Sequence, residues 1–256
     1  MMCCAIFGSE MMSKVFCAPL AAAAVAVVSM TSGAEATSIT AASPIFQHGS
    51  ANTGTITDTG PGSGGNAQAG VFSMHNNTDG YDFLAWCLDL YSGISGGATY
   101  NYTMQTAADN PFAGTNGPFL NATQTATIEN LFETNATAVQ AIYGGVNNTN
   151  SAGFQLALWE IVYETAAGPY SLTNGSFRSV ANGVRTAAEG FLANLGGTIE
   201  ANYDLTYWAS NSGRPTGSTQ NLVSISPAAV PVPAAGLMLL TGLAGFGVAS
   251  RRRRKG

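Results

Sequence analysis

The sequence predicts an α+β fold, with strands gathered in the first half of the chain and helices inserted later. Short β-branched and aromatic runs between glycine-rich turns indicate the strands, most of which precede residue 106. Apolar residues spaced by three, four or seven indicate helices between residues 123 and 197. No internal repeat divides this region, so we expect one exported domain over residues 37–210.

The strands are predicted by short apolar runs that turn signals separate. Residues 37–75 contain the runs PIFQHG and GVFSMHN, with a loop expected over residues 59–70. Asp79-Gly80 is typical of a hairpin turn and precedes residues 81–90, whose aromatic and aliphatic side chains indicate a buried strand. The alternating stretch 98–106 is expected to pair with that strand, and a last strand is expected at residues 203–210.

Three helical segments are expected between these strands. The first covers residues 123–145, the second covers residues 151–169 with Ser151 as its N-cap, and the third lies within residues 174–197. On the second segment, Glu160 and Glu164 are four residues apart, which is more typical of a solvated stripe than of an acid–base pair. Residues 211–229 are rich in Ser, Pro and Gly and are expected to form a linker.

Charge is scarce and unevenly distributed along the chain. Charged residues make up 9% of the sequence, against roughly 25% in an average soluble domain, and polarity comes instead from Thr, Asn, Ser and 31 glycines. Residues 37–229 contain no lysine, and their only cations are Arg178, Arg185 and Arg214. Nucleic-acid binding requires clustered Lys and Arg, so this composition argues against that class and favours a neutral extracellular protein.

The first 36 residues are typical of a cleaved signal peptide. Lys14 provides the positive region, residues 15–30 are mostly apolar, and Ala34 and Ala36 form an A-x-A cleavage site. The mature chain would therefore begin near Thr37. Residues 1–11 are a possible extended start, because Met12 would open a more ordinary signal.

The last 27 residues, 230–256, have three parts in a fixed order. Val230, Pro231 and Pro233 lie at the start of 21 uncharged residues, about the length of a transmembrane helix. An arginine cluster, Arg251, Arg252, Arg253 and Arg254, follows and would remain cytoplasmic. A plain tail anchor is one interpretation of this pattern.

This order of Pro-x-Pro, apolar span and arginine cluster resembles the PEP-CTERM sorting signal, although Val232 stands where that family usually has Glu. The resemblance implies an exosortase-type processing enzyme as a partner and a transient anchor in the inner membrane. It also implies export to the cell surface or the extracellular matrix of a Gram-negative bacterium, as in a biofilm.

Cys87 is the cysteine that would remain after signal cleavage, because Cys3, Cys4 and Cys17 all precede residue 36. Exported proteins normally pair their cysteines, so an odd one implies intermolecular pairing, a free thiol or different chemistry. Burial as a small apolar side chain is the alternative.

Two short stretches suggest a partner for this cysteine. FLAWCLDLYSG, at residues 83–93, places Cys87 between aromatic residues, and FQLALWEIVYE, at residues 154–164, places Gln155 in the first turn of an expected helix. Together they resemble the thioester domains of bacterial surface adhesins. The resemblance implies a bond between the Cys87 sulfur and the Gln155 side-chain carbonyl. Trp86 and Trp159 would shield that bond, unless they are ordinary core residues.

The expected function is therefore non-enzymatic, with no cofactor and no metal. The protein would be a covalent adhesin whose thioester reacts with amines on a partner surface or in an exopolysaccharide matrix. The absence of lysine from residues 37–229 suits a chain that stores an amine-reactive bond. The alternative is a non-reactive structural component of that matrix. A cysteine hydrolase would need His48 or His75 as its base, and neither lies in a known signature.

Overall fold

The computed structural model describes residues 36–47, 49–58, 65–90, 92–109, 111–112, 120–145, 148–164, 168–211 and 219–228. The expected sorting tail lies outside these residues, as do residues 1–35 of the expected signal peptide. The described strands are β1 (Ala36–Phe46), β2 (Ala51–Asp58), β3 (Gly65–Ala69), β4 (Phe72–Asn76), β5 (Tyr81–Cys87), β6 (Thr99–Gln105), β7 (Phe177–Ser179), β8 (Tyr203–Ser210) and β9 (Leu222–Pro227). The helices are the short 3₁₀ helix η1 (Ala107–Asp109), α1 (Ala122–Thr134), α2 (Ala136–Tyr143), α3 (Asn148–Tyr163) and α4 (Gly183–Ala193).

Six strands close into a barrel in the order β1-β4-β5-β9-β8-β6, with β6 paired back to β1. Every pairing in it is antiparallel. Closure pairs β1 with β6, and β9, the last described strand, inserts between β5 and β8. The barrel therefore depends on residues from both ends of the described domain.

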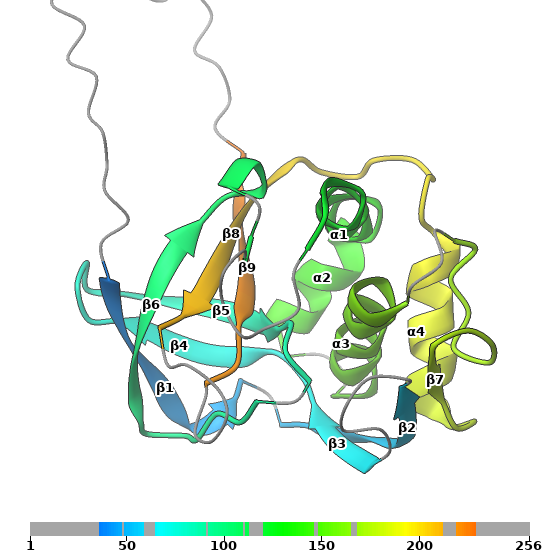
Figure 1. The fold of residues 1–256 in the computed structure, drawn as a ribbon, viewed down its shortest axis with the longest axis horizontal. Helices are drawn as coiled ribbons and strands as arrows, with labels where there is room; N and C mark the ends of the chain where they lie inside the picture. The colour runs from blue at the N-terminus through cyan, green and yellow to red at the C-terminus, as the bar shows by residue number, and fades with distance from the viewer. Residues whose placement is uncertain are drawn as a thin grey trace, which may run out of the picture. The chain divides into compact units, whose positions relative to one another are not determined.

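The helices lie on one side of the barrel, and a second sheet with the order β3-β2-β7 runs beneath them (Figure 1). Helix α3 is the centre of this part, since every residue from Ser151 to Val162 is buried. A helix that is apolar on all sides must be surrounded by protein, and α3 contacts α1, α2, α4 and the smaller sheet. A Cβ on Gly153 would lie 2.6 Å from the Ala187 Cβ, so glycine permits the close approach of α3 and α4.

The mixed fold agrees with the sequence prediction, but several elements differ. The strands expected at residues 81–90 and 203–210 are β5 and β8. The stretch 98–106 contains β6, which pairs with β1 and β8, so its expected pairing with the strand at 81–90 is wrong. Residues 65–69, expected in a loop, form β3. The linker expected over residues 211–229 instead contributes β9, which completes the barrel.

The helical predictions also need correction. The segment expected as one helix over residues 123–145 is two helices, because the Asn135 side chain donates to the Leu131 and Phe191 carbonyls and competes with the helical backbone. Helix α3 begins at Asn148, so Ser151 lies inside it and its hydroxyl accepts a hydrogen bond from the Val71 N–H. The third segment expected to be helical, residues 174–197, contains strand β7 first and helix α4 after it.

Candidate functional site

Cys87 and Gln155 meet where the barrel contacts the central helix. Cys87 is the last residue of β5, pairs with Leu222 of β9 and is 1% exposed. Gln155 lies on α3 and is equally buried. The sequence prediction required these two residues, 68 positions apart, to lie together, and the structure brings them into direct contact.

The contact consists of two hydrogen bonds between the Gln155 amide and the Cys87 backbone. Gln155 Oε1 accepts from the Cys87 N–H at 2.8 Å, and Gln155 Nε2 donates to the Cys87 carbonyl at 2.5 Å. This pairing fixes the plane of the Gln155 amide beside the residue that carries the thiol. It also draws electron density from the Gln155 carbonyl carbon, because Oε1 receives a backbone N–H.

Gln155 does not lie in the first turn of its helix, as the sequence had suggested. It is the eighth residue of α3, so the positive end of the helix dipole, which acts over the first turn, does not reach it. Burial raises the pKa of the Cys87 thiol well above its usual range, and the charge of Asp89 adds to the increase. The nearby Asp89 backbone and Trp159 indole lower the pKa by less. The thiol is therefore neutral at physiological pH.

The residues that follow Cys87 are held to α3 at a second point. The Tyr163 hydroxyl accepts a hydrogen bond from the Leu90 N–H at 2.9 Å and donates to the Leu88 carbonyl at 3.5 Å. The Cys87 thiol donates to the Asp89 carbonyl at 3.1 Å, and the Asp89 carboxylate accepts from the Ser92 hydroxyl at 2.5 Å. The Cys-x-Asp pattern thus orders the turn after β5 and restricts the position of the sulfur.

A small cavity of about 60 Å³ adjoins the Cys87–Gln155 contact. Trp159 lines it, as expected of a shielding residue, and is 3% exposed. Trp86 does not line it, because neighbouring residues of a strand point to opposite faces, and its ring instead packs against Phe154 at a centroid distance of 4.8 Å. Of the two tryptophans, Trp159 therefore lies at the cavity, whereas Trp86 is an ordinary core residue.

The remaining walls of this cavity come from segments that the sequence did not single out. They are the end of β3 and the turn after it, the start of β4, the turn after β5, and the segment before β9. The residues concerned are Ala67, Gln68, Ala69, Gly70, Phe72, Leu90 and Gln220. Of these residues, Gly70 is the one that the sequence could have pointed to, because a glycine can mark a close approach of the backbone. A Cβ on Gly70 would lie 3.1 Å from the Gly49 carbonyl oxygen and 3.3 Å from the Ser151 hydroxyl oxygen.

The other candidate groups lie away from this contact. His75 Nδ1 is 2.6 Å from an Asp82 carboxylate oxygen on the exposed surface of β4 and β5. Asp82 is five residues before Cys87 on β5, roughly 16 Å away along the strand, so His75 cannot serve as a base for that thiol. His48 lies outside the described residues. None of the described helices is both long and apolar enough to cross a membrane.

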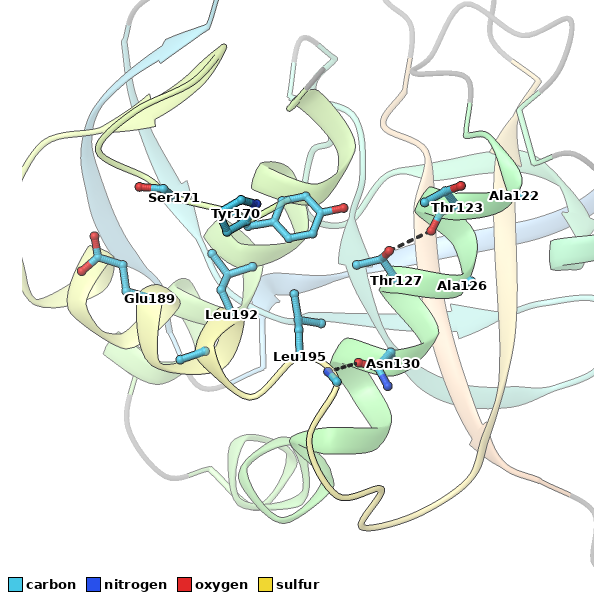
Figure 2. A pocket seen from close by; sticks show the side chains of 13 residues that line it. Ala122, Thr123, Ala126, Thr127, Asn130, Tyr170, Ser171, Glu189, Leu192 and Leu195 are labelled. Atoms are coloured by element: carbon cyan, nitrogen blue, oxygen red, sulfur yellow. Dashed lines mark hydrogen bonds between the residues drawn. The ribbon is translucent and has the colours of Figure 1, made fainter. Parts of the chain in front are cut away.

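A larger groove of about 940 Å³ opens on the helical side of the molecule (Figure 2). One wall is α1, a second is the end of α4 with the turn after it, and Tyr170 extends across the groove toward α1 (Figure 2). Asn130 of α1 accepts a hydrogen bond from the Gly196 N–H at 2.8 Å and so joins two of the walls. None of the residues singled out in the sequence as a site lines this groove.

Glu160, expected on a solvated face, is fully buried behind the segment that carries Tyr170. Its Oε1 accepts a hydrogen bond from the Ser171 N–H at 2.8 Å, while its Oε2 is buried without a hydrogen-bond partner among the described residues. Burial, with the nearby Glu164 adding to it, raises the pKa of Glu160 to about 7, against the opposing Ser171 hydrogen bond. The expectation of a solvated stripe is therefore wrong for Glu160.

No protein-family model and no curated protein matches this chain. Among solved structures, the fold is similar to the N-terminal domain of the Streptococcus pyogenes pilus tip adhesin Cpa, with 13% identity and a TM-score of 0.41 over 68% of this chain and 93% of that one. It is also similar to the N-terminal thioester domain of a surface protein from Clostridium perfringens, with 11% identity and a TM-score of 0.38 over 66% of this chain and 96% of that one. Neither likeness is close enough to transfer the role of any residue to this chain.

Proposed function

We propose that this protein is an exported surface adhesin in which Cys87 and Gln155 form an internal thioester that captures amines on a partner surface. The observation that supports the proposal most directly is the paired hydrogen bonding of the Gln155 amide with the Cys87 backbone. It holds the Gln155 side-chain carbonyl against the backbone of the residue that carries the thiol, in a buried site next to a small cavity. No lysine between residues 37 and 229 offers a competing side-chain amine.

Formation of the bond needs no added reagent. The Cys87 sulfur attacks the Gln155 carbonyl carbon, whose oxygen is polarised by the Cys87 N–H at 2.8 Å. The thiol proton passes to the amide nitrogen, the carbon–nitrogen bond breaks, and ammonia leaves. The Nε2 hydrogen bond to the Cys87 carbonyl is lost with the nitrogen, whereas the bond to Oε1 persists.

Reaction with a partner reverses the roles of sulfur and nitrogen. A primary amine attacks the same carbon, an amide bond forms, and the sulfur leaves with the proton that the amine gives up. The raised pKa of the Cys87 thiol makes its thiolate a poor leaving group, which slows reaction with water and with free amines alike. The stored bond would therefore persist until an amine is held against it.

Mass spectrometry of the intact protein, before and after treatment with methylamine, tests the proposal. We expect a mass lower by one ammonia before treatment, and methylamine attached to Gln155 with a free Cys87 thiol afterwards. Cys87→Ala is the control, because it removes the nucleophile and should keep the full mass. Full-mass wild-type protein with an unmodified Gln155 would refute the thioester.

A passive structural role in an extracellular matrix is the second candidate. It is favoured by one observation, namely that the Gln155 amide is already satisfied by backbone groups and needs no covalent bond. Thiol titration of the native protein separates the two functions. A Cys87 thiol that becomes titratable when a small amine is added supports the adhesin. A Cys87 thiol that becomes titratable only when the protein is unfolded supports the passive role.

A further inference from the structure

Gln220 presents a buried acceptor that has no hydrogen-bond partner. Its Oε1 atom is inaccessible to solvent and unpaired among the described residues, and the residue lines the cavity of about 60 Å³ that contains Cys87 and Gln155. A buried, unpaired acceptor is costly, at about 1–3 kcal/mol, so its presence beside a reactive pair requires an explanation.

The position of Gln220 is fixed by its neighbours. Its carbonyl accepts a hydrogen bond from the Tyr102 hydroxyl at 3.0 Å, and the following carbonyl, of Asn221, accepts from the Leu88 N–H at 2.8 Å. Leu222, two residues after Gln220, pairs with Cys87 in the barrel. The backbone of Gln220 is therefore anchored beside the end of β5 by the same strand pairing that closes the barrel.

A buried hydrogen-bond donor without a partner among the described residues belongs to another residue that lines the same cavity. The Trp159 Nε1–H is buried, lacks a hydrogen-bond partner among the described residues and lies close enough to Cys87 to lower the thiol pKa. The cavity is thus lined by two residues that carry one acceptor and one donor without a partner among the described residues. Its volume has room for roughly two water-sized groups, which suits the end of an unbranched primary amine.

We propose that Gln220 Oε1 receives an N–H of the attacking amine and aims the nitrogen lone pair at the Gln155 carbonyl carbon. This inference rests on the proposed thioester. During attack one N–H points to Gln220, the new carbon–nitrogen bond forms, and the carbon–sulfur bond breaks. The proton lost by the amine ends on the Cys87 sulfur, which faces the Trp159 N–H as negative charge develops. Gln220 is a catalytic residue in this step, although it keeps no proton.

The test compares the variants Gln220→Leu, Gln220→Glu and Gln68→Leu. Gln68 is the matched control, because it lines the same cavity but its Oε1 already accepts from the Ser50 hydroxyl at 2.9 Å. Thioester content is measured by intact mass, and the rate of Cys87 thiol release is then followed with methylamine and with methanethiol. Methanethiolate is similar in size to methylamine but has no N–H to donate.

We expect Gln220→Leu to form the thioester normally, to react about tenfold more slowly with methylamine and to react with methanethiol at the wild-type rate. Gln220→Glu keeps an acceptor and should react with methylamine at close to the wild-type rate, as should Gln68→Leu. An unchanged methylamine rate in Gln220→Leu would overturn the role of Gln220 while leaving the thioester intact. Loss of the thioester from Gln220→Leu, or equal slowing with both nucleophiles, would also overturn it. A wild-type protein without the thioester would instead refute the proposed function.

Discussion

Glu160→Gln should remove a large pH dependence from the stability of this protein. The pKa of Glu160 is raised from 4.5 to about 7, with burial as the largest cause. Between about pH 4.5 and pH 7 the folded protein keeps a proton that the unfolded chain releases. The free energy of unfolding must therefore fall as pH rises through this range.

The size of the effect follows from the shift. Each pKa unit corresponds to about 1.4 kcal/mol, so Glu160 can contribute at most about 3 kcal/mol, fully present below pH 4.5 and lost above pH 7. Glutamine has nearly the same shape and keeps an oxygen that can accept from the Ser171 N–H. The substitution should therefore remove the titration and keep the fold.

Urea denaturation from pH 4.5 to pH 8 measures the difference. Wild-type stability relative to Glu160→Gln should decrease by up to about 3 kcal/mol across this range. Glu164→Gln is the matched control, since Glu164 lies one turn later, accepts from the Ser176 N–H at 2.8 Å and is only half-buried. Parallel curves for wild type and Glu160→Gln would refute the reasoning, because they would mean that Glu160 titrates alike in both states.

Two further substitutions test how α3 is held in place. Gly153→Ala would bring a Cβ to 2.6 Å from the Ala187 Cβ, so we expect a loss of about 1–3 kcal/mol in urea denaturation, and unchanged stability would contradict the close α3–α4 packing. Tyr163→Phe removes the hydroxyl that accepts from the Leu90 N–H, so we expect a loss of about 1–2 kcal/mol by the same assay. A stability equal to wild type would show that this hydroxyl does not hold the segment after β5.

Local patterns predicted the parts of the fold that local interactions determine. The run containing Cys87 is apolar enough to indicate a buried strand, and β5 lies there. The division of the first helical segment was not predicted, because Asn135 acts through the Phe191 carbonyl, 56 residues away. Strand β9 was not predicted either. Its short apolar run lies between Ser, Pro and Gly residues that dominate the composition of residues 211–229.

The residues of the candidate site also differ in whether the sequence alone could identify them. Cys87 and Gln155 could be named from the sequence because each lies in a recognisable stretch. Gln220 could not be named, because its significance comes from an unpaired acceptor that only the folded cavity reveals. Glu160 was misjudged because its partner is a backbone N–H, which carries no signal in the sequence.

The position of β9 in the barrel has a consequence for when the site can exist. Cys87 pairs with Leu222, and Gln220 comes just before that strand, so one wall of the site is synthesised well after Cys87 and Gln155. A growing chain that has not yet released residue 222 lacks the neighbour that positions its thiol. The cavity around Cys87 and Gln155 is therefore complete only after β9 has been synthesised and has paired with β5. A chain truncated before residue 220 would lack one wall of that cavity and could not complete the proposed amine-capturing site.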